Sequence, residues 1–203
     1  MKENRRQCTD LLCKHVGRKV VWLQKLLMSN ASSGKAMAAQ MRRSVNHEIG
    51  SDPSVWGVTL GDLPVLLQGR GDFPSFAEQV THLAICLYAV HQQSHAKPMH
   101  VSGCKLGYAI RDFISVRNGD IGSDPTIRRF NALNTADSIE EMAWHLRSIV
   151  LLLRSQGIPL DYVQLSADLF SFSFLDERDS VRLKWGRQLY SERRLTKGNT
   201  SAV

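Results

Sequence analysis

The side chains best suited to chemistry in this sequence are arginines set at helical spacing. Arg147 and Arg154 are seven residues apart, or two α-helical turns, so we expect both on one face, opposite the apolar stripe of the same segment. A guanidinium binds phosphate oxygens through paired hydrogen bonds, so such a row can follow a nucleic-acid backbone. A surface ion pair is the alternative, because Glu140 and Glu141 lie within reach of Arg147 along a helix.

The positive charge of the chain is concentrated near its start. Residues 1–43 contain ten Lys or Arg and two Asp or Glu, a local charge of +8, whereas the whole chain carries +7. The remaining residues therefore sum to about −1. A field of this kind attracts polyanions, among which nucleic acid is the leading candidate. A solvated basic face without a specific partner is the alternative.

No arrangement of residues indicates an enzyme. The run Ser-Gly-Lys at residues 33–35 lacks the earlier glycine of a phosphate-binding loop, and no G-x-S-x-G or H-E-x-x-H motif occurs. Around one loop, His91, His95, His100 and Cys104 offer the ligand types of a zinc site but not a usual spacing. We therefore expect no catalysis, no cofactor and no metal, and we assign these histidines to hydrogen bonding or solvent.

Helical periodicity accounts for most of the chain. Apolar residues at spacings of three and four predict helices over residues 9–27, 35–50, 76–93, 104–116, 125–133, 139–153, 162–170 and 179–193. We expect caps at the starts of four of these helices, from Ser75, Asp124, Ser138 and Asp161. The prolines and glycines of residues 51–74 leave room only for short helical turns.

The fold class that follows is all-α. No segment alternates apolar and polar residues as a half-buried strand does. We expect two small helical bundles, residues 1–116 and residues 117–203, the second with a frayed tail. A content of 43% hydrophobic and 22% charged residues excludes a disordered chain. No apolar run approaches the roughly 18 residues that span a membrane, and no secretory signal is evident, so we expect a cytoplasmic protein.

Several motifs, taken in order, resemble one known family. They are A-V-H-Q-Q-S after residue 88, K-L-G-Y-A-I-R-D-F from Lys105, I-R-R-F-N-A-L from Ile127, and L-R-S-I-V-L-L-L-R-S-Q-G-I-P-L-D-Y from Leu146. With the following V-R-L-K-W-G-R-Q-L-Y, this order is similar to the CasB family, which supplies the small subunit of Cascade, the type I-E CRISPR surveillance complex. The resemblance covers most of residues 10–192.

The resemblance implies a non-catalytic, all-helical scaffold inside a guide-RNA complex. Its partners would be a second copy of itself, the complex backbone with its large subunits, and the single-stranded DNA of the R-loop. Carried over by position, the residues implied to bind nucleic acid are Arg42, Arg43, Lys105, Arg111, Arg128, Arg129, Arg147 and Arg154.

A protein-interaction adaptor is the second class of function that the sequence allows. In that case the basic surface would bind acidic partner subunits instead of DNA. Competition by single-stranded DNA for the surface separates the two. A free-standing transcription regulator would need a recognition helix, and the sequence offers none.

Overall fold

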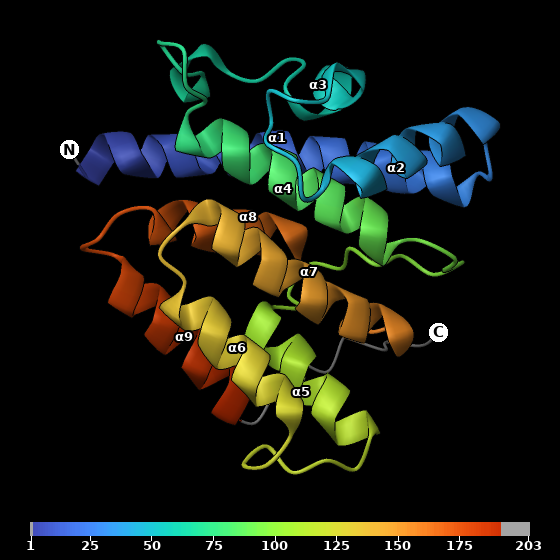
Figure 1. The fold of residues 1–203 in the computed structure, drawn as a ribbon, viewed down its shortest axis with the longest axis vertical. Coiled ribbons are helices and arrows are strands. Elements are labelled where there is room, and N and C mark those ends of the chain that lie inside the picture. Colours follow the sequence, from blue (N-terminus) through green and yellow to red (C-terminus); the bar gives the residue numbers. More distant parts are fainter. Residues whose placement is uncertain (1, 192–203) are drawn as a thin grey trace, which may run out of the picture.

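The protein has an all-α fold, which confirms the predicted fold class. The computed structural model describes residues 2–191. Within that range the long helices are α1 (Lys2–Met28), α2 (Ser32–Ser44), α4 (Phe76–His91), α5 (Leu106–Val116), α6 (Pro125–Thr135), α7 (Ile139–Ser155), α8 (Tyr162–Phe172) and α9 (Arg178–Tyr190) (Figure 1). Residues 51–74 form only the single-turn helix α3 (Trp56–Thr59) and two 3₁₀ turns, Pro53–Val55 and Val65–Leu67, as predicted. None of the helices between residues 2 and 191 is long and apolar enough to cross a membrane.

Side-chain caps fix the ends of several helices where the sequence places them. The Ser75 hydroxyl accepts the Glu78 N–H at 3.0 Å, and the Glu78 carboxylate accepts the Ser75 N–H at 2.6 Å, so α4 begins with a complete capping box. Asp124 and Asp161 accept backbone N–H groups in the first turns of α6 and α8. Gly157 follows α7 at a φ of +60°, a left-handed conformation that suits a residue without Cβ.

The cap predicted from Ser138 forms at the start of α7, but the reciprocal contact of a full capping box is shifted by one residue. Ser138 accepts the Glu141 N–H at 3.2 Å, but the Glu141 carboxylate accepts the N–H of Asp137, at 3.0 Å, instead of the N–H of Ser138. The same carboxylate lies 3.6 Å from His145 Nε2. The Glu141 carboxylate therefore makes its contacts within the first turns of α7 and the residue before them.

α1 begins at Lys2, ahead of the predicted start at residue 9. The Arg5 guanidinium donates to both Asp176 oxygens at 2.8 Å and lies 4.1 Å from the centroid of the Phe174 ring. This contact with a distant segment stabilises the first turns of α1. Those turns are polar, so apolar periodicity does not predict them as helix. The predicted end of the second helix near residue 50 is wrong, because α2 ends at Ser44. The predicted end of the last helix at Arg193 lies outside the described residues.

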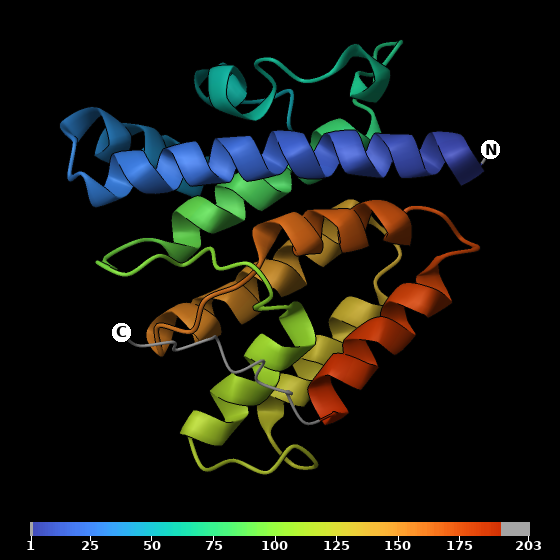
Figure 2. The same ribbon diagram turned by 180° about the vertical axis from the view of Figure 1, so that it is seen from behind.

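The core is built around α4. Every residue from Val80 to His91 is buried. α1 and α2 pack against one side of α4, and α7 and α8 pack against the other (Figure 2). The predicted apolar stripe of α7 faces this core, since Met142, Leu146, Ile149 and Leu153 are all buried. α4 and α7 are therefore held in fixed positions along their length.

The helices α5, α6 and α9 form the far end of the molecule from α1 and α2 (Figures 1 and 2). α5 packs against α7 and α9, α6 packs against α7, and α8 packs against α9. Buried apolar side chains form one continuous cluster from Leu12 to Leu189. The division into bundles of residues 1–116 and 117–203 stays a prediction, and α5, the last helix of the first segment, has its packing partners in the second.

Candidate nucleic-acid interface

Arg42 on α2 and Arg154 on the last turn of α7 come together near the C-terminal end of α4. Both side chains are half-buried. Burial, and then the positive charges of Arg154 and Arg43, lower the pKa of Arg42. The Arg154 guanidinium donates to Gln93 Oε1 at 2.8 Å and reaches the Val90 carbonyl oxygen at 3.5 Å. Arg154 therefore lies against α4 instead of pointing freely into solvent.

A polar pocket of about 450 Å³ opens beside this pair. Its lining includes Lys35, Arg42, Gln92 and His95. His95 Nε2 donates to the Arg154 carbonyl oxygen at 2.8 Å and so ties the loop after α4 to the end of α7. Lys35 and Arg42 are two helical turns apart, so both lie on the same side of α2. The pocket can hold an anionic group of phosphate size against several N–H donors.

Arg42, Arg43 and Arg154, which we call the α2–α7 arginine cluster, have no paired acid in the described part of the chain. Within residues 2–191 no carboxylate forms an ion pair with any of the three. Arg42 and Arg154 are half-buried and Arg43 is exposed, and like charges at half-buried positions repel one another more strongly than they would in bulk water. An anion placed beside them relieves that repulsion, which makes the cluster a candidate binding site.

Arg147 occupies α7 two turns before Arg154. Its side chain is half-buried, and its Nε is buried without a hydrogen-bond partner among the described atoms. No ion pair joins it to Glu140 or Glu141 within residues 2–191. The surface ion pair that the sequence left open for Arg147 is therefore not formed among the described residues, and its half-buried side chain lies on the helix that also carries Arg154.

The structure does not bring the other candidates to the α2–α7 cluster. Arg128 and Arg129 are exposed on α6, at the far end of the molecule (Figure 1). Lys105 is the N-terminal cap position of α5 and is half-buried. The Arg111 guanidinium donates to the Ser191 carbonyl oxygen and so fastens the end of α9 to α5. The eight basic residues predicted to bind nucleic acid therefore do not form one surface. One of them, Arg111, already makes a hydrogen bond within the protein.

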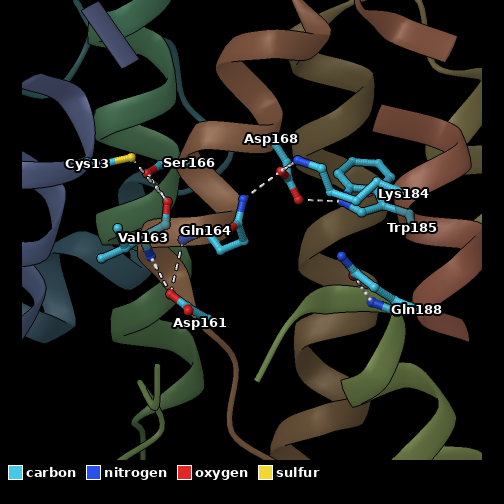
Figure 3. A network of polar contacts seen from close by, with 10 residues as sticks. Cys13, Asp161, Val163, Gln164, Ser166, Asp168, Lys184, Trp185 and Gln188 are labelled. Carbon is cyan, nitrogen blue, oxygen red and sulfur yellow. Dashed lines mark hydrogen bonds and ion pairs between the residues drawn. The ribbon is translucent and has the colours of Figure 1, made fainter. Parts of the chain in front are cut away.

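Basic side chains of α9 are mostly bound within the protein. Asp168, buried on α8, accepts Lys184 Nζ at 2.6 Å, the Trp185 indole N–H at 2.8 Å and the Gln164 amide at 2.8 Å (Figure 3). Arg182 lies 3.1 Å from Asp179. The basic composition of α9 therefore has a structural explanation, unlike the α2–α7 cluster.

The histidines considered for zinc have separate hydrogen-bonding roles. The His91 Nδ1 lies 3.0 Å from the Tyr162 hydroxyl, and the His100 Nδ1 accepts the Tyr162 backbone N–H at 3.2 Å. His95 is bonded to the end of α7 as described above. Between residues 2 and 191 no three His, Cys, Asp or Glu side chains are grouped to hold a metal ion. The expectation that the protein binds no metal stays a prediction.

Sequence reasoning missed Lys35 and His95 as members of the site. In the sequence, Lys35 was considered only as part of an incomplete phosphate-binding loop. It is nevertheless seven residues from Arg42, the same spacing that separates Arg147 from Arg154. That shared spacing is the signal that identifies Lys35. His95 carries no comparable signal, because a loop brings it to the cluster.

Comparisons with known proteins point to one family. The family described as CRISPR-associated protein Cse2 matches residues 37–190. The solved structure of CasB from Thermobifida fusca is 29% identical, with a TM-score of 0.74 over 89% of this chain and 98% of that chain. A CRISPR-associated protein of the Cse2 family from Thermus thermophilus is 27% identical, with a TM-score of 0.63 over 86% of this chain and 97% of that chain. No curated protein matches the chain.

The matched region contains the whole α2–α7 arginine cluster and Arg147. Because the family match spans well over half of the chain and solved members share its fold, the protein belongs to the Cse2 family of CRISPR-associated proteins, which includes the CasB proteins.

Proposed function

We propose that this chain is the non-catalytic small subunit of a cytoplasmic, type I-E CRISPR complex of the Cascade kind, and that it binds nucleic-acid backbone. In this role it lies beside a guide RNA and the large subunits and pairs with a second copy of itself. It holds the displaced single strand of the R-loop during antiviral defence, while base pairing to the guide reads the sequence. Membership of the Cse2 family supports the assignment to a CRISPR complex.

The uncompensated Arg42 and Arg154 pair is the observation that carries the nucleic-acid role. Burial and Arg154 both lower the pKa of Arg42, and no acid within residues 2–191 is paired with either guanidinium. A phosphodiester bears a permanent negative charge and presents oxygens that match the guanidinium fork. A backbone phosphate therefore satisfies both the charge and the hydrogen-bonding groups of the cluster.

Arg147 and Lys35 extend the proposed contact beyond a single phosphate. Arg147 is two turns from Arg154 on α7, and Lys35 is two turns from Arg42 on α2, so each lies about 10 Å along its helix from the cluster. Successive phosphates of an extended strand are separated by several ångströms, so a strand can engage more than one of these groups. Such contacts position a backbone without reading bases, so we expect nearly sequence-independent binding.

The remaining candidates form a second proposed contact region. Arg128 and Arg129 are exposed on α6, and Lys105 and Arg111 lie on and beside α5. Because Arg111 already donates to the Ser191 carbonyl oxygen, its replacement is expected to affect the α5–α9 contact as well as any ligand. Arg128 and Arg129 are therefore the cleaner test of this region.

Direct binding of a single-stranded oligonucleotide by the full chain tests the proposal. Fluorescence anisotropy is measured with a labelled oligo-dT for the natural protein and for Arg42→Gln/Arg154→Gln. We expect the double variant to bind at least about tenfold more weakly, since two charge-assisted contacts are lost. The matched control is Arg70→Gln/Arg187→Gln, which removes two exposed arginines and the same charge from other surfaces. The Arg128→Gln/Arg129→Gln variant, measured in parallel, tests the second region.

Equal weakening by the cluster variant and by the control would show that only net charge matters and would contradict a site at Arg42 and Arg154. Unchanged affinity in the cluster variant would favour the adaptor alternative, in which the basic surface binds acidic subunits. Circular dichroism and thermal unfolding of each variant check that helix content and stability are retained, because Arg154 also donates a hydrogen bond to Gln93 within the protein.

A further inference from the structure

A second pocket lies on the opposite half of α7 from Arg154 and differs from the first in chemistry. It has a volume of about 200 Å³ and lies between the segment after α2, the middle of α4 and the start of α7. Its apolar lining is Val45, Ile49, Leu83, Ile139, Ala143 and Trp144. The Trp144 side chain is 66% exposed at its mouth. A volume of this size accommodates one large apolar side chain.

The carboxylates beside this pocket form no ion pair within the part of the chain that the structure describes. Glu48 and Glu140 both contribute to its lining and are exposed. Neither forms an ion pair with a Lys, Arg or His among residues 2–191. On a chain that carries +7 overall, two unpaired acids beside an exposed indole form a local acidic rim.

His82 adds a buried acceptor to the lining. The residue is 4% exposed, and its Nε2 donates to the Ser44 carbonyl oxygen at 3.2 Å. Burial lowers the pKa of His82, which favours the neutral ring in which Nδ1 is an acceptor. That Nδ1 is buried and has no hydrogen-bond partner among the described atoms. His82 therefore contributes an uncharged part of the pocket wall, near Glu48 and Glu140.

We propose that this pocket docks a protein partner, through a short segment that inserts one large apolar side chain flanked by Lys or Arg. The apolar walls and Trp144 bury the inserted side chain, and Glu48 and Glu140 pair with the flanking cations. The arrangement is that of an interface anchor, in which an aromatic residue at the centre supplies the affinity and charges at the rim supply the selection of the partner.

The charges favour a protein segment over a nucleic-acid base. A base stacked on Trp144 would bring its phosphates close to Glu48 and Glu140, and like charges at an interface are unfavourable. Trp144 and Arg154 are ten residues apart, about 15 Å along α7, so the acidic rim and the arginine cluster select opposite charges at two places on one helix. Arg147 lies between them, so a nucleic-acid probe is included in the test.

NMR of the full chain with two matched peptides tests the docking site. The sequence contains four tryptophans, so the ¹H–¹⁵N spectrum carries four indole signals, and Trp144→Phe assigns one of them. The basic probe is acetyl-Gly-Arg-Phe-Arg-Gly-amide and the acidic probe is acetyl-Gly-Glu-Phe-Glu-Gly-amide. We expect the basic peptide to shift the Trp144 signal saturably, and the acidic peptide to bind at least about fivefold more weakly, as expected for exposed ion pairs.

Charge reversal on the protein supplies the matched control. Glu140→Lys is expected to remove the preference for the basic peptide, whereas Glu3→Lys, also in the first turn of a helix and exposed, leaves the preference unchanged. The basic peptide is also expected to shift the backbone amide signals of residues 45–49, which line the pocket. Trp144→Ala is expected to abolish these shifts, whereas Trp22→Ala, which also removes an exposed indole, is expected to preserve them. Thermal unfolding of each variant confirms that it folds.

Absence of a saturable shift with the basic peptide, or equal shifts with both peptides, would overturn the proposal. A saturable shift of the Trp144 signal by oligo-dT alone would also overturn it, because the pocket would then belong to the nucleic-acid surface. The indole signal of Trp144 does not report on the α2–α7 cluster. A negative result for the docking site therefore leaves the proposed DNA-binding role untouched, and the reverse also holds. Peptide binding that persists in Arg42→Gln/Arg154→Gln demonstrates that independence.

Discussion

The Asp168 carboxylate and the Trp185 indole N–H are hydrogen-bonded at 2.8 Å in the interior between α8 and α9. Asp168 is 1% exposed, and it also accepts Lys184 Nζ and the Gln164 amide (Figure 3). Three donors from two helices therefore stabilise one buried charge. The contact holds α9 in position. The end of α9 in turn contacts α5, because Gln188 accepts the Gly107 N–H and the Ser191 carbonyl oxygen accepts the Arg111 guanidinium.

Asp168→Ala is expected to lower the free energy of unfolding by about 3 kcal/mol, because the buried indole N–H loses its acceptor and Lys184 loses its partner. The measurement is urea unfolding followed by circular dichroism. The control is Asp179→Ala, which removes an exposed carboxylate 3.1 Å from Arg182 and is expected to change stability by less than about 0.5 kcal/mol. An equal loss of unfolding free energy in both variants would show that the buried Asp168 network contributes no more to stability than an exposed ion pair.

Two helical glycines are expected to respond to alanine with opposite signs. A Cβ at Gly107 would lie 2.5 Å from the Trp185 carbonyl oxygen, so Gly107→Ala must push α5 away from α9 and is expected to cost about 2 kcal/mol. A Cβ at Gly186 meets no atom within 4 Å, so Gly186→Ala is expected to stabilise α9 by about 0.5–1 kcal/mol through helix propensity. Melting temperatures of the two variants check the pair. A stabilising Gly107→Ala would mean that the α5–α9 contact is looser than described.

His91 makes stability depend on pH below neutrality. Burial lowers its pKa to about 4, below the value of about 6.5 for an unfolded histidine. Between these values the unfolded chain binds a proton that the folded chain does not, so the free energy of unfolding falls as the pH drops from about 6.5 to about 4. His91→Gln is expected to make this fall shallower by up to about 1.4 kcal/mol per pH unit, measured by urea unfolding across that window. An identical slope in the variant would show that His91 is not the titrating group.

The starts of α4, α6 and α8 were predictable because their causes are local. Ser75, Asp124 and Asp161 satisfy N–H groups within three residues, and the stripe of α7 repeats along one segment. Contacts between distant segments were not predictable from periodicity. Arg5 finds Asp176 across 171 residues, and this pair extends α1 beyond its apolar pattern.

The candidate site shows the same limit. The spacing of Arg147 and Arg154 placed both on α7, but it did not show that Arg154 would lie against α4 and face Arg42 on α2. Likewise nothing in the sequence near Arg111 indicates the Ser191 carbonyl oxygen as its acceptor. Helix packing decides which basic residues meet one another and which meet a partner within the protein, and a linear pattern contains only the spacing within each helix.

The salt dependence of DNA binding tests the central claim most directly. The logarithm of the binding constant for oligo-dT is measured against the logarithm of NaCl concentration for the natural protein, for Arg42→Gln/Arg154→Gln and for Arg70→Gln/Arg187→Gln. Each phosphate neutralised on a single strand contributes about −0.7 to this slope, so loss of two contacts is expected to make the slope shallower by about 1.4 in the cluster variant, with little change in the control. A cluster variant whose slope equals that of the natural protein would contradict the assignment of Arg42 and Arg154 to phosphate binding.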